Sequence, residues 1–140
     1  PMQWDDSANA GFSSAAPWFA VNANYPQINV ARQREEAESV LNFYRALIRL
    51  RKQDPVWIEG RYQLQLAEHP HIYAYSRTLG TQQRLVLCNL SGEPQQVDPQ
   101  AMPAGPWQWL LGNYQDNGEW LTLRPYEARI YQQAEATEGI

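Results

Sequence analysis

Residues 39–66, SVLNFYRALIRLRKQDPVWIEGRYQLQL, decide the fold because the spacing of their apolar residues changes along the stretch. In the first half, apolar side chains recur every three or four residues from Val40 to Leu50, as on one face of a helix. In the second half, from Arg61 to Leu66, apolar and polar residues alternate, as in a strand. The stretch therefore predicts a helix followed by a β domain, with a boundary between Asp54 and Gly60.

The predicted helix has charges that suit both of its ends. Acidic residues gather before it at positions 35–38, and basic residues occupy its last turn at 49–52, which complements the helix dipole. Asp54-Pro55 ends the helix, and Asn29 is expected to cap a short turn that precedes it. The apolar stripe is wide, so another element must cover it. Its members are Val40, Leu41, Tyr44, Leu47, Ile48 and Leu50.

The chain beyond Gly60 reads as a series of short strands. Residues 84–90 are almost continuously apolar, which predicts a central strand, and Leu79-Gly80-Thr81-Gln82 before them predicts a hairpin turn. Short strands with turn signals between them are typical of an antiparallel β-sandwich. The expected strands are 61–66, 71–79, 84–90, 95–97, 107–111, 120–123 and 128–132.

The first 29 residues show neither helical nor strand periodicity, which predicts a long loop. Loops of this length are usually functional or held by a neighbouring element. The chain thus reads like a piece of a longer polypeptide. We expect three parts: residues 1–56 with the loop and the helix, 57–134 with the β-sandwich, and a fraying tail at 135–140. The fold class is α+β.

Composition excludes several functions. Of the 140 residues, 44% are apolar and 19% charged, as in a globular protein, and the net charge of −4 disfavours nucleic acid. No apolar run approaches the roughly 20 residues that cross a membrane, and no signal peptide opens the chain. Cys88 is the single cysteine, which excludes an internal disulfide and suits the reducing cytoplasm.

No residue of the chain is expected to be catalytic, and neither a metal nor another cofactor is expected. Asp5 and Asp6 are neighbours in one loop, so they cannot flank a bond from two sides. Glu127 is expected to order a turn through Arg124 or a backbone amide. His69 and His71 could face one metal from a strand, but no third ligand follows at a fixed offset, so a polar loop is favoured.

Two tryptophans offer an alternative function. Trp107 and Trp109 lie at i and i+2 and so share one strand face, where two indoles could stack on sugars as in a carbohydrate-binding module. Leu111 is expected to continue the same face. That continuity favours the inside of the sandwich over a sugar platform.

The chain resembles the α-glucosidase branch of the α-amylase superfamily, the family 13 glycoside hydrolases. The resemblance covers about residues 1 to 132, and the motifs that carry it lie far apart. They are Pro1-Met2-Gln3-Trp4-Asp5, Asn9-Ala10-Gly11-Phe12-Ser13, Pro17-Trp18, Val21-Asn22, Asn24-Tyr25, Ile28-Asn29-Val30, the helix from Ser39 to Lys52, and Leu123-Arg124-Pro125-Tyr126-Glu127-Ala128.

The resemblance implies that the loop follows the eighth strand of a (β/α)8 barrel, that the helix is the last barrel helix, and that the strands form the C-terminal domain. The parent enzyme would hydrolyse α-glucosidic bonds of short oligosaccharides or trehalose 6-phosphate with retention, using carboxylates on earlier barrel strands. This segment would be structural, with the upstream barrel as its partner. Gln3, Trp4 and Asp5 are candidates for the rim of the substrate pocket.

Overall fold

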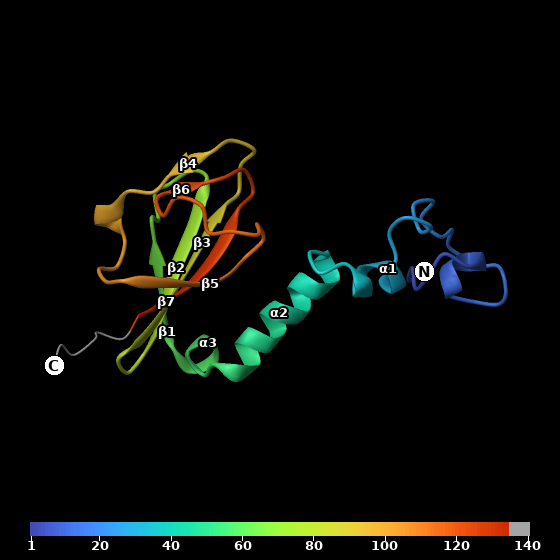
Figure 1. The fold of residues 1–140 in the computed structure, drawn as a ribbon, viewed down its shortest axis with the longest axis horizontal. Coiled ribbons are helices and arrows are strands. Elements are labelled where there is room, and N and C mark those ends of the chain that lie inside the picture. The colour runs from blue at the N-terminus through green and yellow to red at the C-terminus, as the bar shows by residue number, and fades with distance from the viewer. Residues whose placement is uncertain (135–140) are drawn as a thin grey trace. The chain divides into compact units, whose positions relative to one another are not determined.

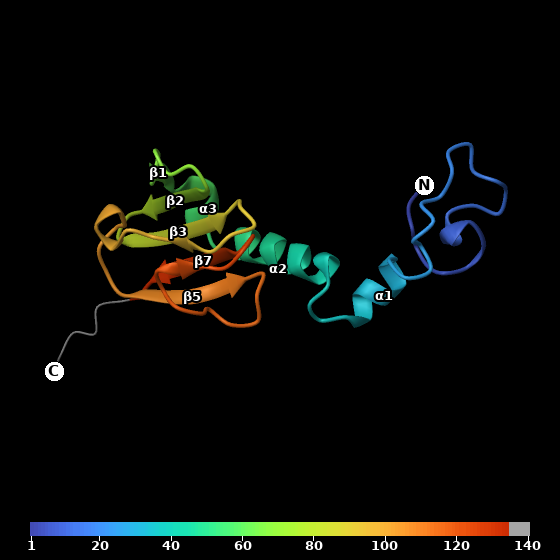
Figure 2. The same ribbon diagram turned by 90° about the horizontal axis from the view of Figure 1, so that it is seen from above.

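The computed structural model describes residues 1–134, and the tail expected at 135–140 lies outside them. The chain divides into two compact units, Pro1–Leu50 and Arg51 onward. Each is described by itself (Figures 1 and 2).

The first unit is a long loop followed by helices. A 3-10 turn, η1 (Ala8–Gly11), interrupts the loop, and α1 (Val30–Glu35) follows it. As predicted, Asn29 caps α1, because its Oδ1 accepts a hydrogen bond of 2.9 Å from the Arg32 N–H. The main helix, α2 (Val40–Gln53), begins where the Ser39 hydroxyl accepts from the Asn42 N–H, and it spans the residues expected from the periodicity.

The α2 stripe lies open within the described residues. No residue of α2 is buried, and Val40, Tyr44 and Ile48 are 66%, 60% and 52% exposed. An amphipathic helix gains most of its stability from packing its apolar face, so α2 has a face that still requires a neighbour.

In the second unit, the end of α2 is followed by a short helix that the sequence did not predict. Asp54-Pro55 ends α2, as expected, but the Asp54 carboxylate then accepts from the Val56 N–H at 3.0 Å and starts α3 (Val56–Glu59). Val56 and Trp57 are buried.

The strands form an antiparallel sandwich, as predicted. One sheet has the order β1-β2-β3-β7-β5, which Figure 2 shows side by side, and a two-stranded sheet pairs β4 with β6. β3 is central, as expected from its continuous apolar run. The bounds are β1 Arg61–Gln65, β2 Ile72–Leu79, β3 Gln82–Asn89, β4 Gln95–Gln96, β5 Trp107–Gly112, β6 Thr122–Leu123 and β7 Ala128–Gln133.

The hydrophobic core lies between the two sheets. Leu85, Leu87 and Tyr131 of the larger sheet face Val97 and Leu123, and all five are at most 3% exposed. Burying large apolar side chains at this depth contributes about 1.5–3 kcal/mol for each one.

A buried ion cluster fixes the turn before β7. Both oxygens of Glu127, which is 1% exposed, accept from Arg129 at 2.8 Å. Arg124 adds a guanidinium hydrogen bond of 2.6 Å and a backbone N–H hydrogen bond of 2.7 Å. Burial alone would raise the pKa of Glu127, but these hydrogen bonds lower it to about 2. Glu127 orders the turn through Arg124, as predicted.

The prediction that Leu111 continues the strand face of Trp107 and Trp109 is wrong. Trp107 and Trp109 pack against the core, and Trp109 pairs with Tyr131 on the core face of β7. A β-bulge between Trp109 and Leu111 inserts one residue, so Leu111 pairs with Ile130 instead. Because successive residues of a strand face opposite sides, Leu111 lies on the outer face of the sheet and does not continue the tryptophan face.

Candidate functional site

The opening segment, residues 1–5, is fastened to the beginning of α1. The Gln3 and Trp4 carbonyls accept from the N–H groups of Val30 and Ala31, each at 2.9 Å. The first N–H groups of a helix have no partner within the helix, so the opening segment supplies the acceptors. This pairing brings together the two ends of the 29-residue loop.

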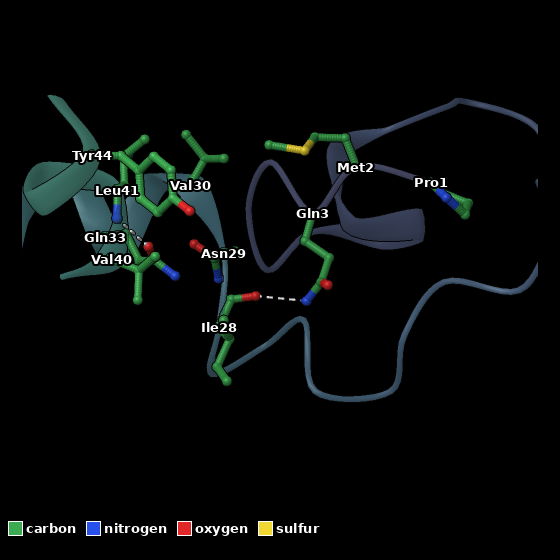
Figure 3. Close-up of a pocket in the computed structure, with 10 residues that line it drawn as sticks. All are labelled: Pro1, Met2, Gln3, Ile28, Asn29, Val30, Gln33, Val40, Leu41 and Tyr44. Carbon is green, nitrogen blue, oxygen red and sulfur yellow. Dashed lines mark hydrogen bonds between the residues drawn. The ribbon is translucent and has the colours of Figure 1, made fainter. Parts of the chain in front are cut away.

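The Gln3 side chain is occupied by the loop. Its Nε2 donates to the Asn24 Oδ1 at 2.9 Å and to the Ile28 carbonyl at 2.7 Å, the contact drawn in Figure 3. These hydrogen bonds hold the amide in place as a structural group.

Trp4 and Asp5 lie beside a left-handed turn. Both backbone N–H groups donate to the Ala10 carbonyl, at 2.9 and 3.3 Å. Asn9, Ala10 and Gly11 have φ values of 55°, 57° and 65°. A left-handed residue other than glycine costs about 1–2 kcal/mol, so the surrounding loop must hold this turn in place.

Gly11 combines a left-handed φ of 65° with close packing against the Asp5 carboxylate. A Cβ at position 11 would lie 2.7 Å from the Asp5 Oδ2, closer than real carbon and oxygen atoms approach. The other oxygen, Oδ1, accepts from the Ser7 N–H at 2.9 Å and from its hydroxyl at 2.5 Å. These hydrogen bonds, the side-chain one foremost, lower the pKa of Asp5, so this carboxylate is ionised at neutral pH.

A pocket of about 380 Å³ lies within the first unit, between the opening segment and α2 (Figure 3). The apolar periodicity of residues 40–50 predicted the helix side of the pocket, but no pattern in the sequence predicted the pocket itself. Only pairing between distant segments creates it. Its lining consists of Pro1, Met2, Gln3, Ile28, Asn29, Val30, Gln33, Val40, Leu41 and Tyr44. Of the three predicted rim residues, Gln3 alone lines it.

An aromatic pair in the loop was also missed as a candidate. The rings of Trp18 and Phe19 stack with centroids 5.4 Å apart, and the side chains are 95% and 70% exposed. The only signal was an aromatic dipeptide directly after Pro17.

The tryptophans of the alternative sugar platform are occupied by the sandwich. The Trp107 indole donates to the Pro103 carbonyl at 3.2 Å, and the Trp109 Nε1 is buried without a partner in the described part of the chain. Packing against the core takes up ring surface that a stacked sugar would need.

His69, Asp54 and Cys88 each lie in a structural environment. The His69 Nδ1 accepts from the N–H groups of His71 and Ile72, at 3.2 and 3.0 Å, which uses a lone pair that a metal would need. Asp54 pairs with Arg84 at 2.6 Å, and burial raises the pKa of Cys88. Among residues 1–134, no group of three or more possible ligands could hold a metal, and no helix is long and apolar enough to span a membrane.

Two family models match the chain in succession. Residues 1–60 match the alpha amylase catalytic domain, and residues 62–130 match the maltogenic amylase C-terminal domain. The chain therefore belongs to the α-glucosidase branch of glycoside hydrolase family 13, and it contains the end of the catalytic domain and the C-terminal domain.

Sequence similarity to known proteins extends along almost the whole chain. An oligo-1,6-glucosidase of Heyndrickxia coagulans is 45% identical over 131 residues, which are 94% of this chain and 23% of the relative. The trehalose-6-phosphate hydrolase of Escherichia coli K12 is 39% identical over 131 residues, which are 91% of this chain and 24% of the relative. The chain thus spans about a quarter of the length of these relatives.

Solved structures show the same similarity. The Bacillus licheniformis trehalose-6-phosphate hydrolase superposes with a TM-score of 0.87 at 30% identity, covering 96% of this chain and 25% of that one. The isomaltulose synthase of Klebsiella sp. LX3 superposes with a TM-score of 0.84 at 33% identity, and the match covers 96% of this chain and 25% of the synthase.

Proposed function

We propose that this chain is the C-terminal segment of a retaining α-glucosidase that hydrolyses short α-glucosides or trehalose 6-phosphate. The observation that carries the proposal is that the two matched families follow one another along the chain. The relatives, an oligo-1,6-glucosidase and a trehalose-6-phosphate hydrolase, are about four times as long as this chain. Retaining hydrolysis needs two carboxyl groups about 5–5.5 Å apart on either side of the bond. In our proposal both belong to the part of the enzyme upstream of Pro1.

The acids of this segment that form ion pairs suit a structural role better than a catalytic one. Glu127 is held by two arginines, and Asp54 and Asp116 each pair with one. An acid that must donate a proton near neutral pH needs a raised pKa, whereas the pKa of Glu127 is lowered to about 2.

The first unit would close the barrel. Its open α2 stripe would pack on upstream barrel elements, and the loop would place Trp4 and Asp5 at the rim of the substrate pocket. The exposed indole of Trp4 and the ionised carboxylate of Asp5 are groups that bind sugar rings and sugar hydroxyls. A cytoplasmic location fits the single thiol, Cys88.

The test of the function is hydrolysis of an aryl α-glucoside. The full-length protein should release the aryl alcohol, and the 140-residue chain should release none. Turnover by the short chain, or an inactive full-length protein tested with several α-glucosides, would contradict the proposal.

The packing of α2 is tested in the full-length protein with two serine variants of adjacent residues. Ile48→Ser should lower the unfolding free energy by about 1.5–3 kcal/mol, because a buried isoleucine is lost. Arg49→Ser, on the other side of the helix, should have little effect. Equal effects of the two substitutions would show that the stripe is not covered.

A further inference from the structure

The loop between β5 and β6 contains the one asparagine of the sequence that is followed by a glycine, Asn117-Gly118. The side-chain amide of an asparagine can react with the backbone nitrogen of the next residue, which is one reason that asparagine is thermolabile in proteins. A side chain on that next residue hinders the approach, and glycine has none. Within this sequence, the reaction is therefore least hindered at Asn117.

The fold leaves the Asn117 amide unfastened. The residue is exposed, and within residues 1–134 no hydrogen bond holds its side chain, whereas each of the other asparagines makes at least one. Asn113 of the same loop shows the contrast. Its Nδ2 donates to the Tyr126 carbonyl and its Oδ1 accepts from the Ala128 N–H, both at 2.8 Å. The Asn117 amide can therefore rotate towards its own main chain, and the Asn113 amide cannot.

The nitrogen that would attack this amide lies beside a proton acceptor. The Gly118 N–H donates to the Asp116 Oδ1 at 2.8 Å, which is within the reach required of a general base. Gly118 has a φ of 49°, a left-handed conformation that glycine adopts without strain. The turn thus combines an unhindered nitrogen, an acceptor for its proton and an exposed amide carbon in consecutive residues.

We propose that Asn117 is a site of spontaneous covalent modification, with water as the co-reactant. The Gly118 nitrogen forms a bond to the Asn117 Cγ, and its proton leaves with Nδ2 as ammonia, which closes a succinimide ring. Water then opens the ring. Breaking the new bond between Cγ and nitrogen gives aspartate, and breaking the original peptide bond gives isoaspartate, so that one water is consumed for each ammonia released. In isoaspartate the main chain runs through Cβ and Cγ and is longer by one carbon atom.

The modified residue lies between two carbonyl groups that hold the ion cluster. The Asp116 carbonyl accepts from the Arg124 Nη2 at 2.8 Å, and the Glu119 carbonyl accepts from the Arg129 Nη1 at 2.6 Å. A Cβ at Gly118 would lie 2.9 Å from the Arg129 Nη2, so the main chain passes close to this buried guanidinium. A carbon atom inserted between the two carbonyls displaces at least one of them and leaves a donor without its acceptor. The isoaspartate form should therefore unfold more easily.

The test of the modification is incubation of the full-length protein at pH 8, followed by digestion at acidic pH. Mass spectrometry with electron-transfer fragmentation detects the gain of about 1 Da at each asparagine and distinguishes isoaspartate from aspartate. Asn113 is the control within the same loop. Asn117→Gln is the matched variant, because the longer side chain would have to close a larger and less favourable ring.

Asn117 should convert at least about tenfold faster than Asn113, which is held by its two hydrogen bonds, and Asn117→Gln should gain no mass at this position. Equal conversion of the two asparagines would overturn the inference. So would a folded protein that keeps its amide at Asn117 while the same protein in urea loses it, because the native loop would then prevent the reaction.

A second measurement tests the effect on the ion cluster. The isoaspartate form, isolated by chromatography, should unfold at a lower urea concentration than the fresh protein. Asn117→Asp adds the same charge on a main chain of normal length, so it should unfold close to the fresh protein. An isoaspartate form that unfolds at the same urea concentration as Asn117→Asp would refute the role of the main chain between the two carbonyls.

Discussion

The ion cluster around Glu127 supports a quantitative prediction. In Glu127→Gln, the amide cannot balance the charges of Arg129 and Arg124, and Arg129 is itself 1% exposed. Removing one charged partner of a buried ion pair lowers the unfolding free energy by about 3–5 kcal/mol, because the other charge stays buried without a partner. The pKa gives a similar figure: lowering it from 4.5 to about 2 corresponds to about 3 kcal/mol at pH 7.

The same contribution should depend on pH with a definite sign. The pKa of Glu127 is lower in the folded state than in the unfolded state, so its stabilisation is complete above about pH 4.5 and is lost as the pH falls towards 2. Acid should thus destabilise the wild-type chain more than the Glu127→Gln variant in this window.

The assay is urea unfolding followed by circular dichroism at pH 7 and at several values between pH 5 and pH 2.5. Glu127→Gln should lose about 3 kcal/mol at pH 7, and the loss should shrink as the pH falls. Asp98→Asn is the control, because Asp98 is exposed and only caps the short turn η2 (Pro99–Ala101). A loss below about 1 kcal/mol, or one that is independent of pH, would refute the reasoning.

Three further predictions concern single side chains. Asn29→Ala should cost about 1 kcal/mol, because α1 loses its cap, and helical circular dichroism should fall; unchanged ellipticity and stability would contradict the role of the cap. Leu87→Ala should cost about 2–5 kcal/mol in urea unfolding, because Leu87 is completely buried; a loss under 1 kcal/mol would mean that the core is loosely packed. Cys88 should react with a disulfide reagent at pH 8 more slowly than free cysteine, since burial raises its pKa, and an equal rate would exclude that environment.

Periodicity and capping were enough to predict the elements. The helix ends followed from charge placement and Asp54-Pro55, and the continuous apolar run of residues 84–90 identified the central strand. The resemblance, carried by motifs at both ends of the chain, indicated the family.

The features that the sequence did not reveal depend on contacts between distant segments. The pocket beside Gln3 forms only when the opening segment pairs with Val30 and Ala31, and no local pattern marks that pairing. Helix α3 was hidden because Asp54-Pro55 was interpreted as an end alone, although the same aspartate also begins a new turn. The strand alternation of Tyr62, Leu64 and Tyr75 was visible, but their position on the outer face required the register.

The bulge in β5 has a consequence for protein engineering and for aligning relatives. Deleting Leu110 would remove the extra residue and leave Trp109 opposite Tyr131 and Leu111 opposite Ile130. The strand would then alternate regularly, and every residue that follows would keep its face. A homologue that lacks one residue here should therefore need no compensating exchanges at the neighbouring positions, and a gap in an alignment at this point marks the loss of a bulge.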